Sequence, residues 1–248
     1  AGTTRDAIDT DVLTPDGRTI TLIDTAGIRR RGKVERGVEK LSVLSSMLSL
    51  RRANVAALVL DATQGPTEQD AHIAGYCLEA GLPTMILVNK WDAVEKDHRT
   101  ADQFTKMLEQ EWGFLRYAPV IYISARTGLR AHRVFDTAER IFANASRRIQ
   151  TRELNQWLEA TVAARPVQSG GVRLPKIRYI TQVAVLPPTF TMFVNDPKLF
   201  HFSYRRYLIN QLREAWDFEG TPIRLFVRSS KRRRDEPQFE DSEPMTEG

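Results

Sequence analysis

Residues 82–92 read Leu-Pro-Thr-Met-Ile-Leu-Val-Asn-Lys-Trp-Asp. The first seven are almost wholly apolar, a pattern typical of a strand that is buried on both faces of a parallel sheet. The next four are polar or aromatic and follow this strand directly. Because ligands bind at the carboxyl ends of strands in open α/β sheets, we expect Asn89, Lys90, Trp91 and Asp92 to line a ligand site.

Apolar runs and helical periodicity alternate on both sides of this segment. Gly81 ends one of the helical stretches, where a left-handed cap costs little. The alternation predicts a doubly wound α/β domain over residues 1–150. Its other expected strands are Asp9–Thr14, Arg18–Asp24, Asn54–Asp61 and Pro119–Ser124, and its expected helices are Gly37–Leu50, Thr67–Ala80, Asp97–Trp112 and Ala131–Arg148.

The pattern changes near residue 150. A helix is expected from Thr151 to Ala163, followed by a loop rich in Pro and Gly. The remaining segments predict a small α+β domain of order α-β-β-α-β over residues 151–230, and the composition of residues 231–248 predicts a disordered tail. Its strands are expected at Lys176–Leu186, Thr189–Asn195 and Pro222–Arg228, with a helix at Leu199–Trp216.

Composition and charge narrow the function classes. The chain has 248 residues, 42% of them hydrophobic and 27% charged, as in ordinary globular proteins. No apolar run approaches the roughly 20 residues of a membrane helix, and we expect no membrane partner. Cys77 is the one cysteine, which excludes an intrachain disulfide and fits a reducing cytosol. The net charge of +5 resides in residues 151–230, which favours an anionic partner for that part.

Two further strand ends carry side chains suited to a nucleotide. Asp24-Thr-Ala-Gly27 follows an expected strand, so that the Asp24 carboxylate can hold Mg²⁺ and the Gly27 amide can approach a terminal phosphate. Ser124-Ala125 is suited to a backbone contact with guanine O6. A carboxylate such as Asp92 can accept both the N1–H and the amino group of guanine, which adenine does not offer together. Thr4 can supply a hydroxyl ligand to Mg²⁺.

Each of these pieces alone has an ordinary structural interpretation, as a turn or a helix cap. Their combination in one order, with three pieces at successive strand ends, favours the nucleotide site. The segment Gly27–Val34 matches the spacing of a phosphate-binding loop but ends in Val34, which has no hydroxyl for Mg²⁺. We therefore find no phosphate-binding loop in these 248 residues.

At these residues the chain resembles the Der (EngA) family of bacterial GTPases, which have two tandem G domains and a KH-like domain. The resemblance covers roughly residues 1–230, as a second G domain of P-loop-NTPase type followed by the KH-like domain. It is carried by Ala1–Asp9, Asp24–Ile28, Asp61–Gly65, Thr67–Asp70 and Asn89–Asp92, and later by Pro187–Phe190, Phe193–Pro197, His201–Tyr207 and Phe218–Arg224.

The resemblance implies a GTP-hydrolysing switch that acts in assembly of the large ribosomal subunit in the cytoplasm. It implies GTP, GDP and ribosomal RNA as partners of a monomer, with Mg²⁺ as cofactor and K⁺ as a further ion. Thr4, Asp24 and Gly27 would act in catalysis, with Thr4 and Asp24 on the metal. The nucleotide-binding set implied is Asp24, Thr25, Ala26, Gly27, Ile28, Asn89, Lys90, Trp91, Asp92, Ser124 and Ala125.

Two other functions stay open, the first because no phosphate-binding loop is found and the second because tRNA-modification GTPases share the G-T-T-R-D and D-T-A-G motifs. We expect the natural protein to continue upstream and this chain to bind GTP poorly, so an RNA- or protein-binding module without nucleotide is one alternative. A tRNA-modification GTPase is another, although the order of elements after residue 150 argues against it. The candidate RNA contacts are Lys198, Arg205, Arg206 and Arg213, near Tyr204 and Tyr207. Equally open is a role for these side chains in packing or as solvated surface.

Overall fold

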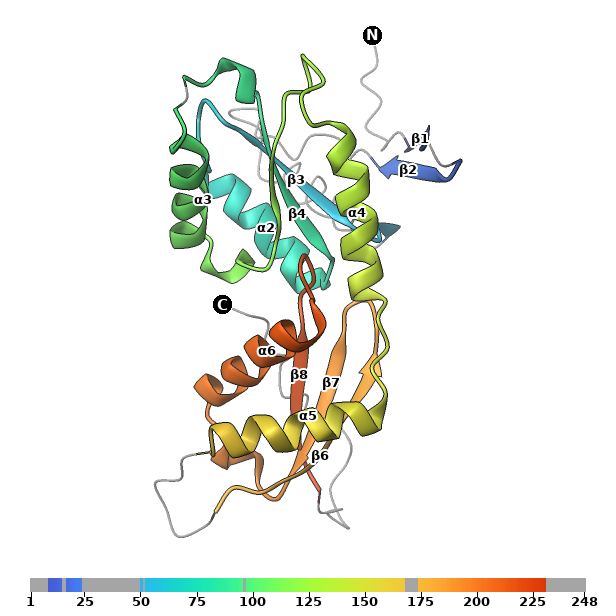
Figure 1. Ribbon diagram of the computed structural model, residues 1–248, viewed down its shortest axis with the longest axis vertical. Helices are drawn as coiled ribbons and strands as arrows, with labels where there is room; N and C mark the ends of the chain where they lie inside the picture. The colour runs from blue at the N-terminus through green and yellow to red at the C-terminus, as the bar shows by residue number, and fades with distance from the viewer. Residues whose placement is uncertain are drawn as a thin grey trace, which may run out of the picture.

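The computed structural model describes residues 9–14, 17–23, 50, 52–95, 97–167 and 174–230. The expected helix Gly37–Leu50 lies outside these residues, apart from its last position, and so does the expected tail. Two groups of elements are visible in Figure 1, with the later one below the earlier one. No helix in the described ranges is long and apolar enough to cross a membrane.

The first group is built on a parallel sheet of order β3-β4-β5. The strands are β3 (Ala56–Asp61), β4 (Thr84–Asn89) and β5 (Val120–Tyr122). Because all strands run in the same direction, each is joined to the next by a helix. These are α2 (Glu68–Ala80) and α3 (Thr100–Glu111), while α4 (His132–Ala145) follows β5. Burial of every residue from Thr84 to Val88 confirms that β4 is the covered, central strand of this sheet.

Helix α2 begins and ends where the sequence predicts. Thr67 accepts a hydrogen bond from the Asp70 amide, and Asp70 accepts one from Thr67, which completes a capping box. Gly81 adopts the left-handed conformation, with φ of 74°. Cys77 is buried on this helix, and burial raises the pKa of its thiol to about 11.

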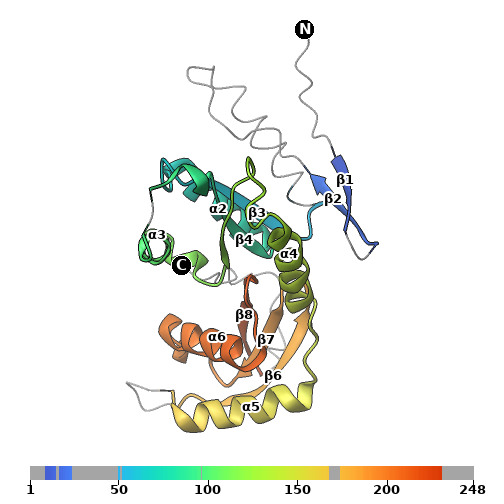
Figure 2. The same ribbon diagram turned by 45° about the horizontal axis from the view of Figure 1, so that its top comes forward.

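The strands β1 (Asp9–Leu13) and β2 (Thr19–Ile23) form the expected antiparallel hairpin. In the described residues this hairpin is a sheet of its own, separate from β3-β4-β5. The hairpin instead contacts α4 through an ion pair of 2.7 Å between Arg18 and Glu139, and Figure 2 shows it projecting beside this helix.

The second group has the predicted order, α-β-β-α-β. It consists of α5 (Thr151–Ala164), β6 (Ile177–Ala184), β7 (Thr189–Val194), α6 (Phe202–Trp216) and β8 (Arg224–Ser229). The sheet order is β6-β7-β8, with β6 antiparallel and β8 parallel to β7. Both helices pack on one face of this sheet, around Leu154, Met192, Leu208 and other buried apolar residues.

Several short hydrogen bonds join the two groups. The Gly220 amide donates to the Tyr117 carbonyl at 2.6 Å, and the Gly220 carbonyl accepts from the Thr84 amide at 2.7 Å. The Leu186 amide donates to the carbonyl of Ala145, at the end of α4. The two bonds of Gly220 lie near the amino-terminal ends of β4 and β5, whereas the predicted ligand site lies at the carboxyl ends of these strands.

Candidate functional site

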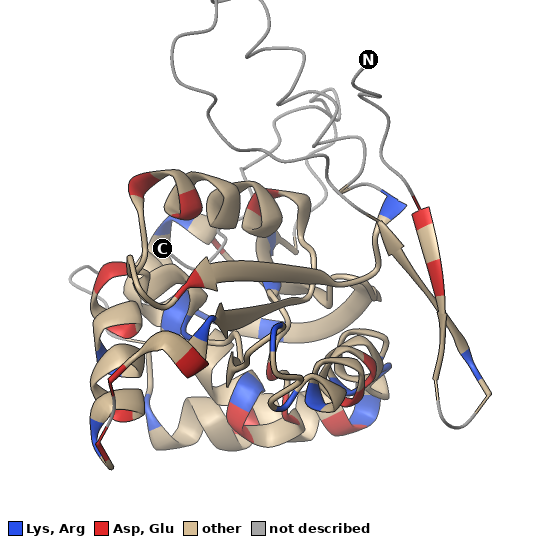
Figure 3. Cartoon of the chain, turned by 90° about the horizontal axis from the view of Figure 1, so that it is seen from above, with Lys and Arg blue, Asp and Glu red and all other residues tan. Residues whose placement is uncertain are grey.

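The predicted guanine-side residues follow the carboxyl ends of β4 and β5, next to the end of β3. Asp61 and Asn89 are register partners, so the ends of β3 and β4 lie side by side. Figure 3 shows acidic and basic residues next to one another at this end of the sheet. The parallel direction of the strands therefore gathers side chains that are far apart in the sequence.

Asn89 ties two loops together. Its Oδ1 accepts a hydrogen bond from the Ala125 amide at 2.9 Å, and its carbonyl accepts one from the Ala62 amide at 2.9 Å. The loop after β5 is thereby held against the end of β4. This is the role in joining loops that the residue type predicts for Asn89.

Lys90 has a left-handed backbone, with φ of 61°, and its Nζ lies 2.6 Å from Oδ2 of Asp61. The hydrogen bond from Lys90, together with bonds from Thr63, lowers the pKa of Asp61 to about 2. Asp61 thus contacts the site but is not among the predicted site residues, although Asp61–Gly65 is one of the segments that carry the family resemblance. Its position at the last residue of a buried strand was the available signal.

Asp92 has two side-chain partners within the chain. Hydrogen bonding with the Ser124 hydroxyl is the main cause of a lowered pKa, to which the Arg126 guanidinium also contributes. Arg126 Nη2 lies 2.5 Å from Asp92 Oδ2, and the Arg126 side chain is 81% exposed. Arg126 therefore occupies one of the two oxygens that a guanine base would need. The sequence analysis did not predict this ion pair, because motif spacing does not show which residue a long side chain will contact.

Trp91 has a packing role. It is 5% exposed, and its ring lies 4.4 Å from that of Tyr122 and 6.2 Å from that of Phe104. Its amide donates to the Ile123 carbonyl. Trp91 therefore anchors the loop from beneath, while Lys90 and Asp92 on either side of it reach the polar surface.

The phosphate and metal side of the predicted site lies outside the described residues. This applies to Thr4 and to Asp24, Thr25, Ala26, Gly27 and Ile28. Within the described ranges, no three His, Cys, Asp or Glu side chains are grouped as a metal site. The fit of Mg²⁺ therefore rests on the chemistry of Thr4 and Asp24 alone.

The basic residues proposed for RNA divide into two kinds. Arg206 and Lys198 are exposed, whereas burial lowers the pKa of Arg205. Arg213 donates to the Phe218 carbonyl at 2.6 Å and lies over the Tyr117 ring at 4.6 Å, so that it contacts both groups of elements.

The neighbouring tyrosines point inward, as the packing interpretation predicts. The hydroxyl of Tyr204 donates to the Arg165 carbonyl at 2.9 Å, and that of Tyr207 donates to the Thr161 carbonyl at 3.3 Å. The rings of Tyr204 and Tyr207 therefore belong to the packing against α5 and the segment that follows it, whereas Phe202 on the same helix is 50% exposed.

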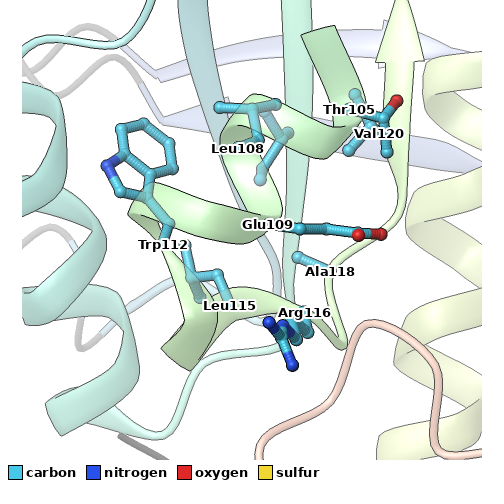
Figure 4. Close-up of a pocket in the computed structure, with 9 residues that line it drawn as sticks. Thr105, Leu108, Glu109, Trp112, Leu115, Arg116, Ala118 and Val120 are labelled. Carbon is cyan, nitrogen blue, oxygen red and sulfur yellow. The ribbon is translucent and has the colours of Figure 1, made fainter. Parts of the chain in front are cut away.

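A pocket of about 220 Å³ lies between α3 and β5 (Figure 4). Leu108, Trp112 and Leu115 give it apolar walls, and Glu109 and Arg116 contribute charged groups. None of its lining residues belongs to the predicted nucleotide site, which lies at the strand ends.

Two family profiles match the chain. The profile "50S ribosome-binding GTPase" matches residues 1–90, and "KH-domain-like of EngA bacterial GTPase enzymes, C-terminal" matches residues 148–228. Among solved structures, that of Era in complex with MgGDPNP and nucleotides of 16S ribosomal RNA aligns at a TM-score of 0.48 and 17% identity, covering 92% of this chain and 82% of that one. This likeness is too weak to add to the assignment.

Curated relatives are much more similar. GTPase Der of Ligilactobacillus salivarius is 47% identical over 230 residues, which are 93% of this chain and 53% of the relative. GTPase Der of Lactobacillus johnsonii is 50% identical over 231 residues, with the same two coverages. The chain thus spans about half the length of the curated relatives that it matches. On these similarities and on its two matched profiles, the chain belongs to the Der (EngA) family.

Proposed function

We propose that this chain supplies the guanine-reading part of a GTP-binding and GTP-hydrolysing switch that acts in assembly of the large ribosomal subunit. The observation that carries the proposal is the juxtaposition of Asn89, Asp92 and Ala125 at adjacent strand ends. Relatives named GTPase Der and a profile described as ribosome-binding support it.

Base recognition follows from the hydrogen-bonding inventory of the site. An ionised Asp92 has two acceptor oxygens, which match the N1–H and amino group of guanine. Asp92 is ionised at neutral pH, and hydrogen bonding with Ser124 lowers its pKa further. The Arg126 guanidinium lies at Asp92 Oδ2 and would compete with a base for that oxygen. Its high exposure makes displacement by a base easy, since an exposed ion pair contributes little.

The proposal also includes the bound ions, the macromolecular partner and the cellular location. Thr4 and Asp24 would hold Mg²⁺, whose charge would offset that of the nucleotide phosphates. K⁺ near the phosphates, ribosomal RNA of the large subunit, a monomeric state and a cytoplasmic location complete the proposal. The matched profile described as a 50S ribosome-binding GTPase supports the ribosomal partner.

Base recognition is tested by NMR titration of the isotope-labelled chain with GDP, and with ADP as the matched control. We expect GDP to shift the Ala125 amide and the Asn89 side-chain amide at millimolar concentration, because the chain carries no phosphate-binding loop motif. ADP should leave both signals in place. Equal shifts with the two nucleotides, or none with either, would overturn guanine recognition.

Substitution of Arg126 sharpens this test. In Arg126→Ala, the Asp92 oxygen is free, and GDP should saturate the Ala125 shift at a concentration about two- to five-fold lower, the range for loss of a competing exposed ion pair. Arg130→Ala, on the same loop, is the control and should titrate like the parent chain. Weaker GDP binding in Arg126→Ala would show instead that Arg126 contacts the nucleotide.

A further inference from the structure

The sheet of the second group is packed on one face only by the helices described above. Ile180, Met192 and Leu225 are 0%, 0% and 1% exposed and point toward α5 and α6. Since side chains alternate along a strand, the residues between them lie on the opposite face. That face carries side chains of a different kind.

Strand register places these side chains in rows across the sheet. Tyr179 is opposite Phe193, which is opposite Arg228. The rings of Tyr179 and Phe193 are stacked, with centroids 4.5 Å apart and planes at 21°. Tyr179 is 45% exposed and Arg228 is exposed as well. An aromatic pair and a cation therefore lie side by side on an accessible surface.

The charge on the three strands has one sign. Strands β6, β7 and β8 contain Arg178, Arg224 and Arg228 and no Asp or Glu. Arg224 is engaged with the first group, because its Nη2 donates to the Glu79 carbonyl at 2.9 Å. Arg228 is the arginine that lies next to the Tyr179–Phe193 pair. The surface is thus complementary to an anionic partner that also offers flat apolar groups.

We infer that this face, with Tyr179, Phe193 and Arg228 at its centre, binds a single-stranded RNA segment through base stacking and phosphate contact. Single-stranded nucleic acid combines exposed bases, which stack on aromatic rings and guanidinium planes, with a charged backbone. The inference rests on the proposed function only for the choice of RNA as the partner. It places the contact on the sheet, whereas the predicted candidates Arg205 and Arg206 belong to α6, on the opposite face.

Matched variants distinguish RNA binding by the sheet face from RNA binding by α6. The test is the fluorescence anisotropy of a fluorescein-labelled single-stranded oligoadenylate titrated with the 248-residue chain, without nucleotide. Tyr179→Ala with Arg228→Gln should weaken binding about ten-fold, because one stacking contact and one cation are lost. Tyr179→Phe keeps the ring and should stay within about two-fold of the parent. Arg206→Gln removes one exposed charge from α6 and is the control.

The outcomes are distinct. Loss of binding in the sheet variant together with retention in Arg206→Gln supports the inference. Unchanged binding in the sheet variant, loss confined to Arg206→Gln, or equal affinity for duplex and single-stranded RNA overturns it. Since the assay contains no nucleotide, a chain that binds RNA but fails the GDP titration would overturn the proposed function and leave this inference standing.

Discussion

The two three-stranded sheets of this molecule differ in where their accessible side chains lie. In the parallel sheet, β4 is buried on both faces, so that its polar side chains gather at the strand end, from Asn89 to Asp92. In the β6-β7-β8 sheet one face is packed and the other carries Tyr179 and Arg228. A strand covered on both faces can offer side chains to a ligand only at its ends, whereas a half-covered sheet can bind along its face.

Gly220 lies in the contact between the two groups of elements, at a position with no room for a side chain. Gly220 has φ of 72°, and a Cβ at this residue would lie 2.3 Å from a methyl carbon of Ile141. Ile141 is fully buried on α4. The loop before β8 therefore fits between the two groups only because residue 220 lacks a Cβ.

The largest expected effect comes from breaking this junction. Gly220→Ala should lower the free energy of unfolding by about 2–4 kcal/mol, because it adds overpacking to a left-handed backbone. Urea unfolding followed by circular dichroism measures the change. Gly113→Ala is the control, since a Cβ there meets nothing within 4 Å. Equal midpoints for the two variants would show that the junction does not couple the sheets.

A smaller effect is expected inside the second sheet. Gln182 is 3% exposed, accepts from the Ile149 amide at 2.8 Å and donates to the Arg147 carbonyl at 2.9 Å. Gln182→Leu would leave both backbone groups without this partner, and we expect a loss of about 1–3 kcal/mol in the free energy of unfolding. Gln156→Leu, at an exposed position of α5, serves as the comparison in the same urea experiment. A loss of equal size there would assign the effect to the added apolar surface.

The smallest effect concerns acid stability of the first sheet. The pKa of Asp61 is lowered to about 2 in the folded chain, against about 3.9 when unfolded. A lowered pKa means that the carboxylate stabilises the fold above the unfolded value and loses this contribution as the pH falls toward 2. In Asp61→Asn, the urea midpoint should therefore fall less between about pH 4 and pH 2. Asp136→Asn, at an exposed position of α4, should keep the parent's slope, and parallel curves for Asp61→Asn and the parent would contradict the role of Asp61.

Patterns along the chain predicted most helices and strands but not all of the contacts between them. The runs at 54–61 and 82–88 became β3 and β4, and Gly81 took the expected cap conformation. The contact of the β1-β2 hairpin with α4, through Arg18 and Glu139, was not predicted, because it depends on how distant elements meet in space. Part of the predicted site, from Asp24 to Ile28, lies outside the described residues and stays a prediction.

The sequence by itself determined the elements, the family and the residues at the strand ends. Short-range periodicity, turn residues and motif spacing are properties of the chain that need no folded context. Only the tertiary structure decided that Arg126 contacts Asp92, that Arg213 is held between the two groups and that Tyr179 stacks on Phe193. Each of these contacts joins residues from different elements, and its geometry is set by how those elements pack.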